Sequence, residues 1–371
     1  MANPPIQLSL QTDKTTPSLT PPVTPISKQN RPPFHTQSSE TENETENVCT
    51  YFTDDLEICR DSNDRNLEFG RGVWSVVYKA RSTPTPNTLG TPPSSPVTAA
   101  QLFAVKAPLR RDARPVLKAE AETLTRLSHI QGSAHHIVPY HGFHTELCAL
   151  VLTAIPLSLS TYIETQADLA RAKPMQAMLE PVAGPTAFKN LARKLIVALN
   201  WLHDTAGVVH GDIKPQNILL RESESEDEFP YEPLFIDFSA TVEIPKSDDA
   251  PVDTTRASMS SFTPPFTAPE MLASLMCSEM APTPASDVFS LAATLLAAAT
   301  GDLLIYSNMN HRLRLEMARS GHQIIDFARS GVSGCRVPRN GFVERVVKPA
   351  VVKDPGLRIS TADWVKLATE A

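Results

Sequence analysis

Cysteine is scarce in this sequence and never occurs in closely spaced pairs. The five cysteines are scattered along the 371-residue chain, at Cys49, Cys59, Cys148, Cys277 and Cys335. Zinc sites and redox motifs usually need cysteines two or three residues apart, and a disulfide framework needs an even number. The sequence therefore argues against a disulfide-stapled or zinc-binding domain and predicts free thiols in a reducing compartment.

Long hydrophobic runs and an excess of positive charge are also missing. The longest apolar run, residues 290–300, is too short to cross a bilayer. The first 25 residues lack the basic start and apolar core of a secretory signal. The formal net charge is −7 and no Lys/Arg cluster stands out, which argues against a nucleic-acid partner. We therefore expect a soluble protein of the cytoplasm, the nucleus or both, with no membrane span.

The N-terminal part has little that could form a core. Residues 1 to about 47 are rich in Pro, Thr, Ser and Asn and have almost no periodic apolar pattern. This composition predicts a disordered tail, which we place at residues 1–63. Residues 48–60 regain aromatic and aliphatic side chains, so they either belong to the tail or pack against the domain that follows.

From residue 64 onward, strand-like alternation gives way to helical spacing. Strands are predicted within residues 67–81, 99–108, 136–143 and 147–155, and helices over 114–129 and 185–204. Exposed loop insertions are predicted at 82–98, which is rich in Pro, Thr and Ser, and at 221–233, which is highly charged. The chain is thus predicted to be an α+β protein, with a small β-rich lobe (64–153, one helix) and a larger, mainly helical lobe (154–371).

The stretch VVHGDIKPQNILL, residues 208–220, places several reactive side chains between two apolar runs. Asp212 can accept a hydroxyl proton, and Lys214 can offset charge on a transferring phosphoryl group. The amide oxygen of Asn217 can bind Mg²⁺. Further on, LFIDFS presents Asp237 at the end of an apolar strand, as a second metal ligand. Each residue alone could be an ordinary turn residue, but this order and spacing favour phosphoryl transfer.

A glycine-rich turn precedes these residues. Gly70, Gly72 and Ser75 form a GxGxxS pattern between two predicted strands. Glycines let a backbone approach phosphate oxygens and aim its N–H groups at them, although a plain hairpin turn has the same pattern.

A single lysine lies in an otherwise apolar predicted strand. Lys106 in FAVK needs an anionic partner if it is buried, whereas a strand-end lysine could reach solvent instead. Glu120, on the next predicted helix, is the candidate partner, and Glu122 is a nearby competitor.

In this order the motifs resemble the eukaryotic protein kinase superfamily, serine/threonine type. GRGVWSVV resembles its phosphate-covering loop, FAVK its strand lysine, HGDIKPQN its catalytic loop and DFS its metal-binding DFG. FTPPFTAPE is similar to the end of the activation segment, which gives Ala268, Pro269 and Glu270. SDVFSLAATLLAAATG, with Asp287, resembles the buried central helix, and KDPGLRIS supplies Arg358, the usual partner of Glu270. The resemblance runs from about Leu67 to the C-terminus and makes residues 64–371 a two-lobed kinase catalytic domain.

The resemblance also implies ligands and site residues. It implies ATP and Mg²⁺ as cofactors and Ser or Thr hydroxyls of protein substrates as acceptors. Catalytic roles go to Asp212, Lys214 and Asn217, and metal binding to Asn217 and Asp237. Nucleotide binding goes to Phe69, Gly70, Arg71, Gly72, Ser75, Val77, Ala104, Lys106, Glu120, Leu152, Thr153, Ile155 and Leu219.

Within that set, Phe69, Val77, Ala104 and Leu219 would sandwich the adenine. Leu152 would stand at the back of the pocket, and the backbone at Thr153 and Ile155 would bond the adenine edge. The same resemblance makes His210 a structural residue packed under Phe238.

Three residues depart from the family pattern. Gly211 replaces an Arg that usually pairs with a phosphorylated residue of the activation segment. We therefore hypothesise that activity does not require phosphorylation through that pocket, despite the available Thr254, Thr255, Ser258, Ser260 and Ser261. Ser75 and Ser239 replace glycines, at a cost of about 1 kcal/mol each if the position needs an unusual backbone conformation.

Two alternative functions stay open. A pseudokinase scaffold would bind ATP without turnover, but it would be expected to lose Lys106, Asp212, Asn217 or Asp237, and all four are present. Small-molecule kinases of the aminoglycoside and choline type share the HGD stretch. They lack the APE segment present here, which favours a protein substrate.

Overall fold

The structure, a computed structural model, describes residues 49–82, 101–172, 178–224, 228–245, 263–273, 281–306 and 309–370. All of them belong to one unit, Asn47–Ala371. Its strands are β1 (Leu56–Ile58), β2 (Glu68–Arg71), β3 (Ser75–Ser82), β4 (Leu102–Pro108), β5 (Tyr140–His144), β6 (Ala149–Thr153), β7 (Val208–Val209), β8 (Ile218–Glu222), β9 (Tyr231–Phe235) and β10 (Val242–Glu243). Its α-helices are α1 (Arg114–Ser128), α2 (Leu159–Arg171), α3 (Pro185–Asn200), α4 (Pro269–Ala273), α5 (Pro284–Thr300), α6 (His311–Arg319), α7 (Ile324–Ser330), α8 (Phe342–Val347) and α9 (Thr361–Glu370).

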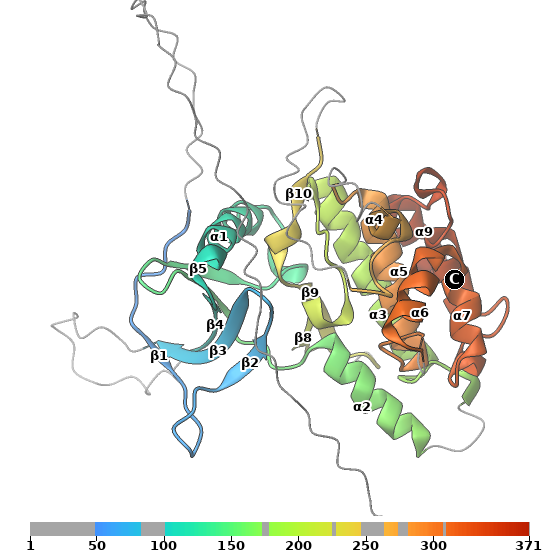
Figure 1. Cartoon of the computed structure of the whole chain (residues 1–371), viewed down its shortest axis with the longest axis horizontal. Coiled ribbons are helices and arrows are strands. Elements are labelled where there is room, and N and C mark those ends of the chain that lie inside the picture. The colour runs from blue at the N-terminus through green and yellow to red at the C-terminus, as the bar shows by residue number, and fades with distance from the viewer. Residues whose placement is uncertain are drawn as a thin grey trace, which may run out of the picture. The chain divides into compact units, whose positions relative to one another are not determined.

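The small lobe is an antiparallel sheet that carries helix α1 (Figure 1). Its strand order is β1-β3-β4-β6-β5, and β2 also pairs with β3. Side chains alternate between the two faces of a strand. On β4, Ala104 and Lys106 therefore share one face, and Phe103 and Val105 share the other. The first pair lines the cleft described below. Together with the helical second lobe, this confirms the predicted α+β architecture.

The folded unit begins earlier than the predicted boundary at residue 64. Strand β1 pairs with β3, with Leu56 opposite Ser82. Residues 49–58, here called the N-terminal strap, also bond to α1 and β5. The sequence did not reveal this strand because it is three residues long and lies among acidic side chains, so its pairing depends on the edge that β3 offers.

The large lobe is built around helix α5. Every residue of α5 from Ser286 to Thr300 is buried, because the helix is apolar or small all round and has neighbours on each side. A capping box between Thr283 and Ser286 starts it. Gly301 ends it with φ of +75°, a left-handed conformation that glycine adopts without strain. Helices α3, α7 and α8 pack against α5.

The charged insertion predicted at 221–233 coincides with a hairpin. Strands β8 and β9 pair antiparallel, with Glu222 opposite Tyr231. Its tip at 225–227 lies outside the described residues, as do residues 83–98 of the first insertion and the five activation-segment hydroxyl residues named above.

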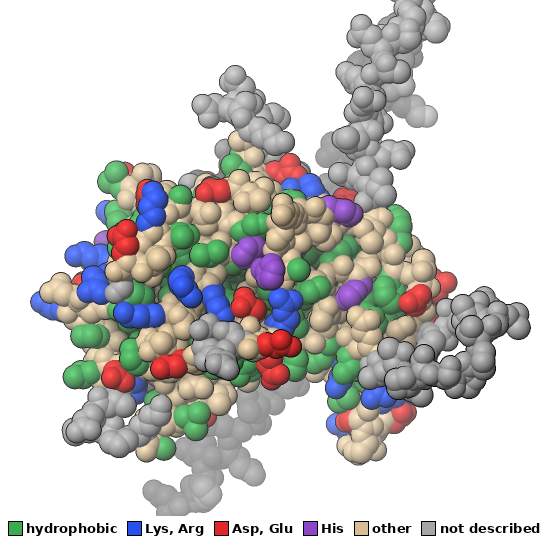
Figure 2. Space-filling view, turned by 180° about the vertical axis from the view of Figure 1, so that it is seen from behind, with side chains coloured by type: hydrophobic (Ala, Val, Ile, Leu, Met, Phe, Trp, Pro, Cys, Tyr) green, Lys and Arg blue, Asp and Glu red, His purple; other side chains and the backbone are tan. Residues whose placement is uncertain are grey.

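One face of the molecule shows how its surface groups are distributed. Figure 2 shows hydrophobic side chains interspersed with polar ones, and Lys and Arg side chains gathering over the large lobe with Asp and Glu among them. The sequence did not indicate this gathering, because it contains no run of basic residues. Among the described residues, no helix is long and apolar enough to cross a membrane.

Candidate active site

A cleft of about 640 Å³ lies between the two lobes. Strands β2, β3, β4 and β6 and helix α1 line it from the small lobe, and residues 212–219 and 236–240 line it from the large lobe. It contains every site residue named from the sequence: Phe69, Gly70, Arg71, Gly72, Ser75, Val77, Ala104, Lys106, Glu120, Leu152, Thr153, Ile155, Asp212, Lys214, Asn217, Leu219 and Asp237. Segments far apart in the chain thus converge on one site.

The inner part of the cleft is apolar. Val77 and Ala104 line it from adjacent strands of the small lobe, and Leu219 lines it from β8. Leu152 lies opposite Ala104 in the β4–β6 pairing, and both side chains are only 8% exposed. Apolar walls of this kind suit an aromatic ring, and a small number of polar groups would fix its orientation.

Three charged groups from distant segments of the chain meet in the same cleft. The Lys106 Nζ lies 2.8 and 2.7 Å from the two Glu120 oxygens and 2.8 Å from Asp237 Oδ1. Glu120 also accepts a hydrogen bond from the backbone N–H of Phe238 at 3.1 Å. Glu120, rather than the competing Glu122, is therefore the partner of the strand lysine.

Burial and neighbouring charges shift the pKa values of these three side chains in opposite directions. Burial alone lowers the pKa of Lys106, but the Asp237 and Glu120 carboxylates outweigh it and the net pKa is raised. Burial would raise the pKa of Asp237, yet the Lys106 charge dominates and holds it well below its usual range. Burial raises the pKa of Glu120, and Lys106 opposes that shift. Lys106 and Asp237 are therefore charged at neutral pH.

A second polar cluster comes from one loop of the large lobe. Lys214 Nζ donates to Asp212 Oδ2 at 2.7 Å, and Asn217 Nδ2 donates to the same oxygen at 2.9 Å. Asn217 Nδ2 also donates to the Asp212 carbonyl at 2.8 Å, which fixes the turn between them. Burial raises the pKa of Asp212, although Lys214 opposes the shift. A carboxylate with a raised pKa is a better proton acceptor.

The buried carboxylate of Asp287 on α5 binds the backbone of this loop. It accepts hydrogen bonds from the backbone N–H groups of His210 at 2.7 Å and Gly211 at 3.0 Å. The ring of His210 packs 4.9 Å from that of Phe238, between centroids. The central helix therefore fixes the backbone that carries Asp212.

Gly211 occupies a position that no other residue fits without a shift. Its φ is +82°, and a Cβ there would lie 2.6 Å from the carbonyl oxygen of Ala240. An arginine at this position would need a different backbone. Gly211 is therefore a structural requirement of this loop as well as a departure from the family pattern.

Two residues that the sequence analysis did not name also contribute. Lys214 Nζ lies 3.4 Å from the Thr263 hydroxyl, so the stretch before the APE motif contacts the catalytic loop. Trp74 lines the cleft beside the glycine-rich turn, and the Arg110 guanidinium lies 4.8 Å from its ring centroid. In the sequence, Trp74 lies within the motif GRGVWSVV and Thr263 within FTPPFTAPE, and these positions could have pointed to both residues.

Two of the other family-like positions are engaged in ion pairs. Arg358 makes a bidentate pair with Glu270, at 2.6 and 2.7 Å, which ties α4 to the segment before α9. Arg71, predicted to contact the nucleotide, lines the cleft and bonds Glu68 of the same strand, with its side chain about half exposed.

The donor set fits a nucleoside triphosphate with Mg²⁺. Both hydrogen bonds described for the Asn217 side chain use its nitrogen, which leaves the amide oxygen for a cation. Asp237 Oδ1 is occupied by Lys106 and Ser239, which leaves Oδ2. Amide and carboxylate oxygens are the ligands that Mg²⁺ prefers, and Lys106 supplies positive charge for phosphate oxygens.

Comparison with known proteins agrees with this geometry. The family model described as "Protein kinase domain" matches residues 96–366, well over half of the chain. The chain is 38% identical over 84 residues to ribosomal protein S6 kinase alpha-4 of Homo sapiens, which covers 22% of this chain and 10% of that protein. It is 32% identical over 170 residues to serine/threonine-protein kinase PknK of Mycobacterium tuberculosis, which covers 46% of this chain and 13% of that protein. The chain thus spans only about a tenth of the length of these relatives. The extent of the family match and the geometry of the cleft show that the chain belongs to the protein kinase domain family.

Proposed function

We propose that this protein is an ATP-dependent protein kinase that phosphorylates Ser or Thr hydroxyls of protein substrates. The observation that carries the proposal is that Asp212, Lys214 and Asn217 line the same cleft as Lys106, Glu120 and Asp237. A proton acceptor, a cation for the transferring group and two oxygen ligands are the parts that phosphoryl transfer needs.

Each residue would act through position and charge, without a covalent intermediate. Asp212 would orient the acceptor hydroxyl and take its proton. Lys214, beside it, would offset the charge that develops on the transferring phosphoryl group. Lys106, held by Glu120, would bind the non-transferring phosphates. Mg²⁺ held by Asn217 and Asp237 would supply further positive charge to the phosphate oxygens.

Two features support Ser and Thr as acceptors. Lys214 bonds Asp212 and the Thr263 hydroxyl, and a lysine two residues after the proton acceptor is the arrangement that the kinase resemblance implies for serine/threonine acceptors. The relatives that match include one whose name states serine/threonine specificity. The hypothesis on Gly211 stays a prediction, since all the activation-segment hydroxyls concerned lie outside the described residues. Replacing all five with Ala should leave activity intact, whereas loss of activity that a single acidic replacement restores would overturn it.

The test is transfer of labelled γ-phosphate from Mg-ATP to the protein itself and to a Ser/Thr peptide mixture. Asp212→Asn and Asp237→Asn variants serve as controls. Phosphoserine or phosphothreonine made only by the unchanged chain is the expected result. If well-folded protein is stabilised by ATP but transfers no phosphate, the proposal fails in favour of a scaffold that binds ATP or a kinase with a small-molecule acceptor.

A further inference from the structure

The N-terminal strap makes direct contact with the helix that carries Glu120. The backbone N–H of Thr50 donates to Thr125 Oγ1 on α1 at 3.0 Å. The same hydroxyl donates to the Ala121 carbonyl one turn earlier, at 2.8 Å. One buried side chain therefore joins the strap to the backbone of α1 next to Glu120.

The strap is in turn fixed to the sheet. Phe52 N–H donates to the Phe143 carbonyl at 3.1 Å, and Phe143 N–H donates to the Thr50 carbonyl at 2.8 Å. The Tyr140 hydroxyl donates to that Thr50 carbonyl as well, at 3.2 Å. Gly142 makes room for this approach, because a Cβ there would lie 2.6 Å from the nitrogen of Phe52. The strap cannot move without breaking several bonds to β5.

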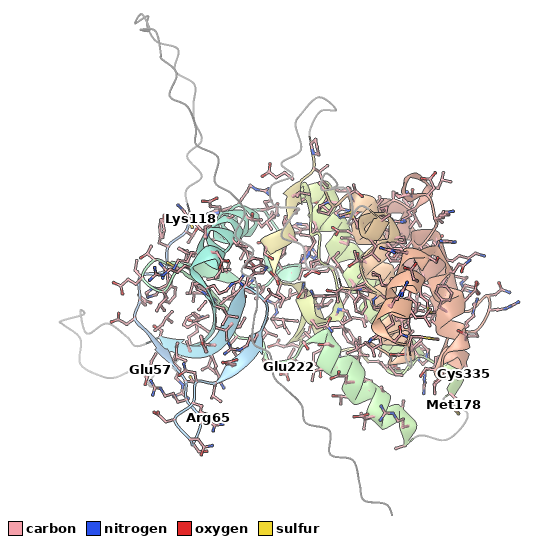
Figure 3. The ribbon with its side chains drawn as sticks, viewed as in Figure 1. Glu57, Arg65, Lys118, Met178, Glu222 and Cys335 are labelled. Carbon is pink, nitrogen blue, oxygen red and sulfur yellow. The ribbon has the colours of Figure 1, made fainter. Side chains whose placement is uncertain are left out.

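Apolar packing continues the attachment across the lobe. The ring of Phe52 packs against that of Phe103 on β4, with centroids 5.4 Å apart. Leu56 of β1 packs on a small cluster that includes Val105. In Figure 1 the strap, drawn in blue, runs from beside α1 to β1, and in Figure 3 Glu57 on β1 lies far from Lys118 on α1. The strap thus braces α1 against three strands.

Helix α1 is therefore held at two places, at the cleft by Glu120 and at the strap by Thr125. Near its middle, Glu120 reaches Lys106 and the N–H of Phe238 across the cleft. One to two turns later, Thr125 is bonded to the strap. Glu120 is only 2% exposed, and a buried carboxylate that loses its cation is costly. The position of α1 relative to β4 therefore decides whether the ion pair forms.

We propose that the strap is a positioning element for the active site, with Thr50 of the strap and Thr125 of α1 as the positioning residues. They hold α1 where Glu120 can bond Lys106, and so set the affinity for nucleotide phosphates. The inference rests on the proposed function, because it assigns a regulator of the same cleft.

The test compares three threonine variants of the full chain. Thr125→Val removes the acceptor for the Thr50 N–H and keeps the side-chain volume, whereas Thr125→Ser keeps the hydroxyl. Thr369→Val is the matched control, since its hydroxyl donates to the Val365 carbonyl one turn earlier in α9, far from the strap. Mg-ATP dissociation constants and hydrogen exchange of the α1 amides are measured for each.

We expect Thr125→Val to weaken Mg-ATP binding roughly two- to tenfold, as the loss of one hydrogen bond implies, and to speed exchange in α1. Thr125→Ser should restore both values, and Thr369→Val should change neither. Gly142→Ala, which displaces the strap from the opposite side, should act in the same direction as Thr125→Val. In a Glu120→Gln background, Thr125→Val should have no further effect on Mg-ATP affinity, since the two residues act in series.

A fall in melting temperature with unchanged Mg-ATP affinity and unchanged α1 exchange would overturn the inference and leave the threonine a merely structural role. An additive effect in the Glu120→Gln background would also overturn it. Failure of the unchanged chain to transfer phosphate would contradict the proposed function, and the exchange measurement would still decide whether the strap positions α1.

Discussion

The two charged clusters that line the cleft are assembled in opposite ways. Asp212, Lys214 and Asn217 come from six consecutive residues and bond one another within a single loop. Lys106, Glu120 and Asp237 come from β4, α1 and the segment after β9, and Lys106 and Asp237 are 131 residues apart in the chain. The side chains of the first cluster bond one another within one loop, which Asp287 of α5 holds in place, whereas the second cluster exists only when a helix, a strand and the large lobe are correctly placed. The chemical step therefore depends more on local structure, and nucleotide binding depends more on tertiary structure.

Removing the proton acceptor should give the largest effect and should distinguish the chemical role of the first cluster from the nucleotide-binding role of the second. Asp212→Asn should lower kcat by about 10²–10⁴-fold, because a positioned general base contributes that much, while Mg-ATP binding stays close to normal. Asp204→Asn changes an exposed aspartate in the helical turn that follows α3; it is the control and should leave kcat unchanged. Steady-state kinetics with a nucleotide titration measures both. An equal loss of Mg-ATP affinity in Asp212→Asn would mean that the clusters are not separable.

Removing the lysine should disturb the fold as well as the site. Lys106→Met leaves Glu120 and Asp237 without their shared cation, and breaking a buried pair from one side costs about 3–5 kcal/mol. The free energy of unfolding, measured by denaturant titration, should fall accordingly. Lys366→Met removes the lysine of the exposed pair with Asp363 and should change nothing measurable. Similar values for both variants would show that burial of Lys106 is less complete than its 8% exposure implies.

Gly211 is the point at which the local cluster depends on a distant segment. Gly211→Ala should cost about 1–2 kcal/mol for the left-handed backbone, plus the clash of its Cβ with the Ala240 carbonyl. Gly207→Ala isolates the first contribution, because Gly207 has φ of +66° and no atom within 4 Å of its Cβ position. Thermal unfolding of both variants should therefore show a larger loss for Gly211→Ala. Equal losses would mean that the Ala240 carbonyl moves aside freely, and that an arginine could be accommodated there.

The same contrast explains what the sequence could predict. The loop cluster was predictable because spacing within six residues determines which side chains can meet. A lysine in an apolar strand predicted an anionic partner for Lys106, but confirming Glu120 over Glu122 required the orientation of α1, and the contact of Lys106 with Asp237 was not predicted. Lys106 and its partners lie on separate elements, so no local pattern specifies their distances.

Other features could not be predicted at all from local pattern. The strap contains only three strand residues, Leu56–Ile58, which lie among acidic side chains, and it is held by pairing with β3 and by hydrogen bonds to α1 and β5. The Thr263 contact with Lys214 joins segments 49 residues apart. The backbone conformation of Gly211 depends on where the Ala240 carbonyl lies. In each case the deciding partner is remote in sequence.

Substitution of Ser239 should give the smallest change in Mg-ATP affinity, because this residue adds one hydrogen bond to the second cluster. Glycine was expected there if the backbone needed an unusual conformation, but Ser239 lies in a short 3₁₀-helix, and the positive φ of +65° belongs to Asp237. Its hydroxyl donates to Asp237 Oδ1 at 2.7 Å and so adds a second donor beside Lys106. Ser239→Ala and Ser239→Gly should both weaken Mg-ATP binding by only a few-fold, as the loss of about 0.5–1.5 kcal/mol implies. Titration calorimetry would measure the affinities. Tighter binding by Ser239→Gly than by the unchanged chain would show that backbone freedom matters more than this hydrogen bond.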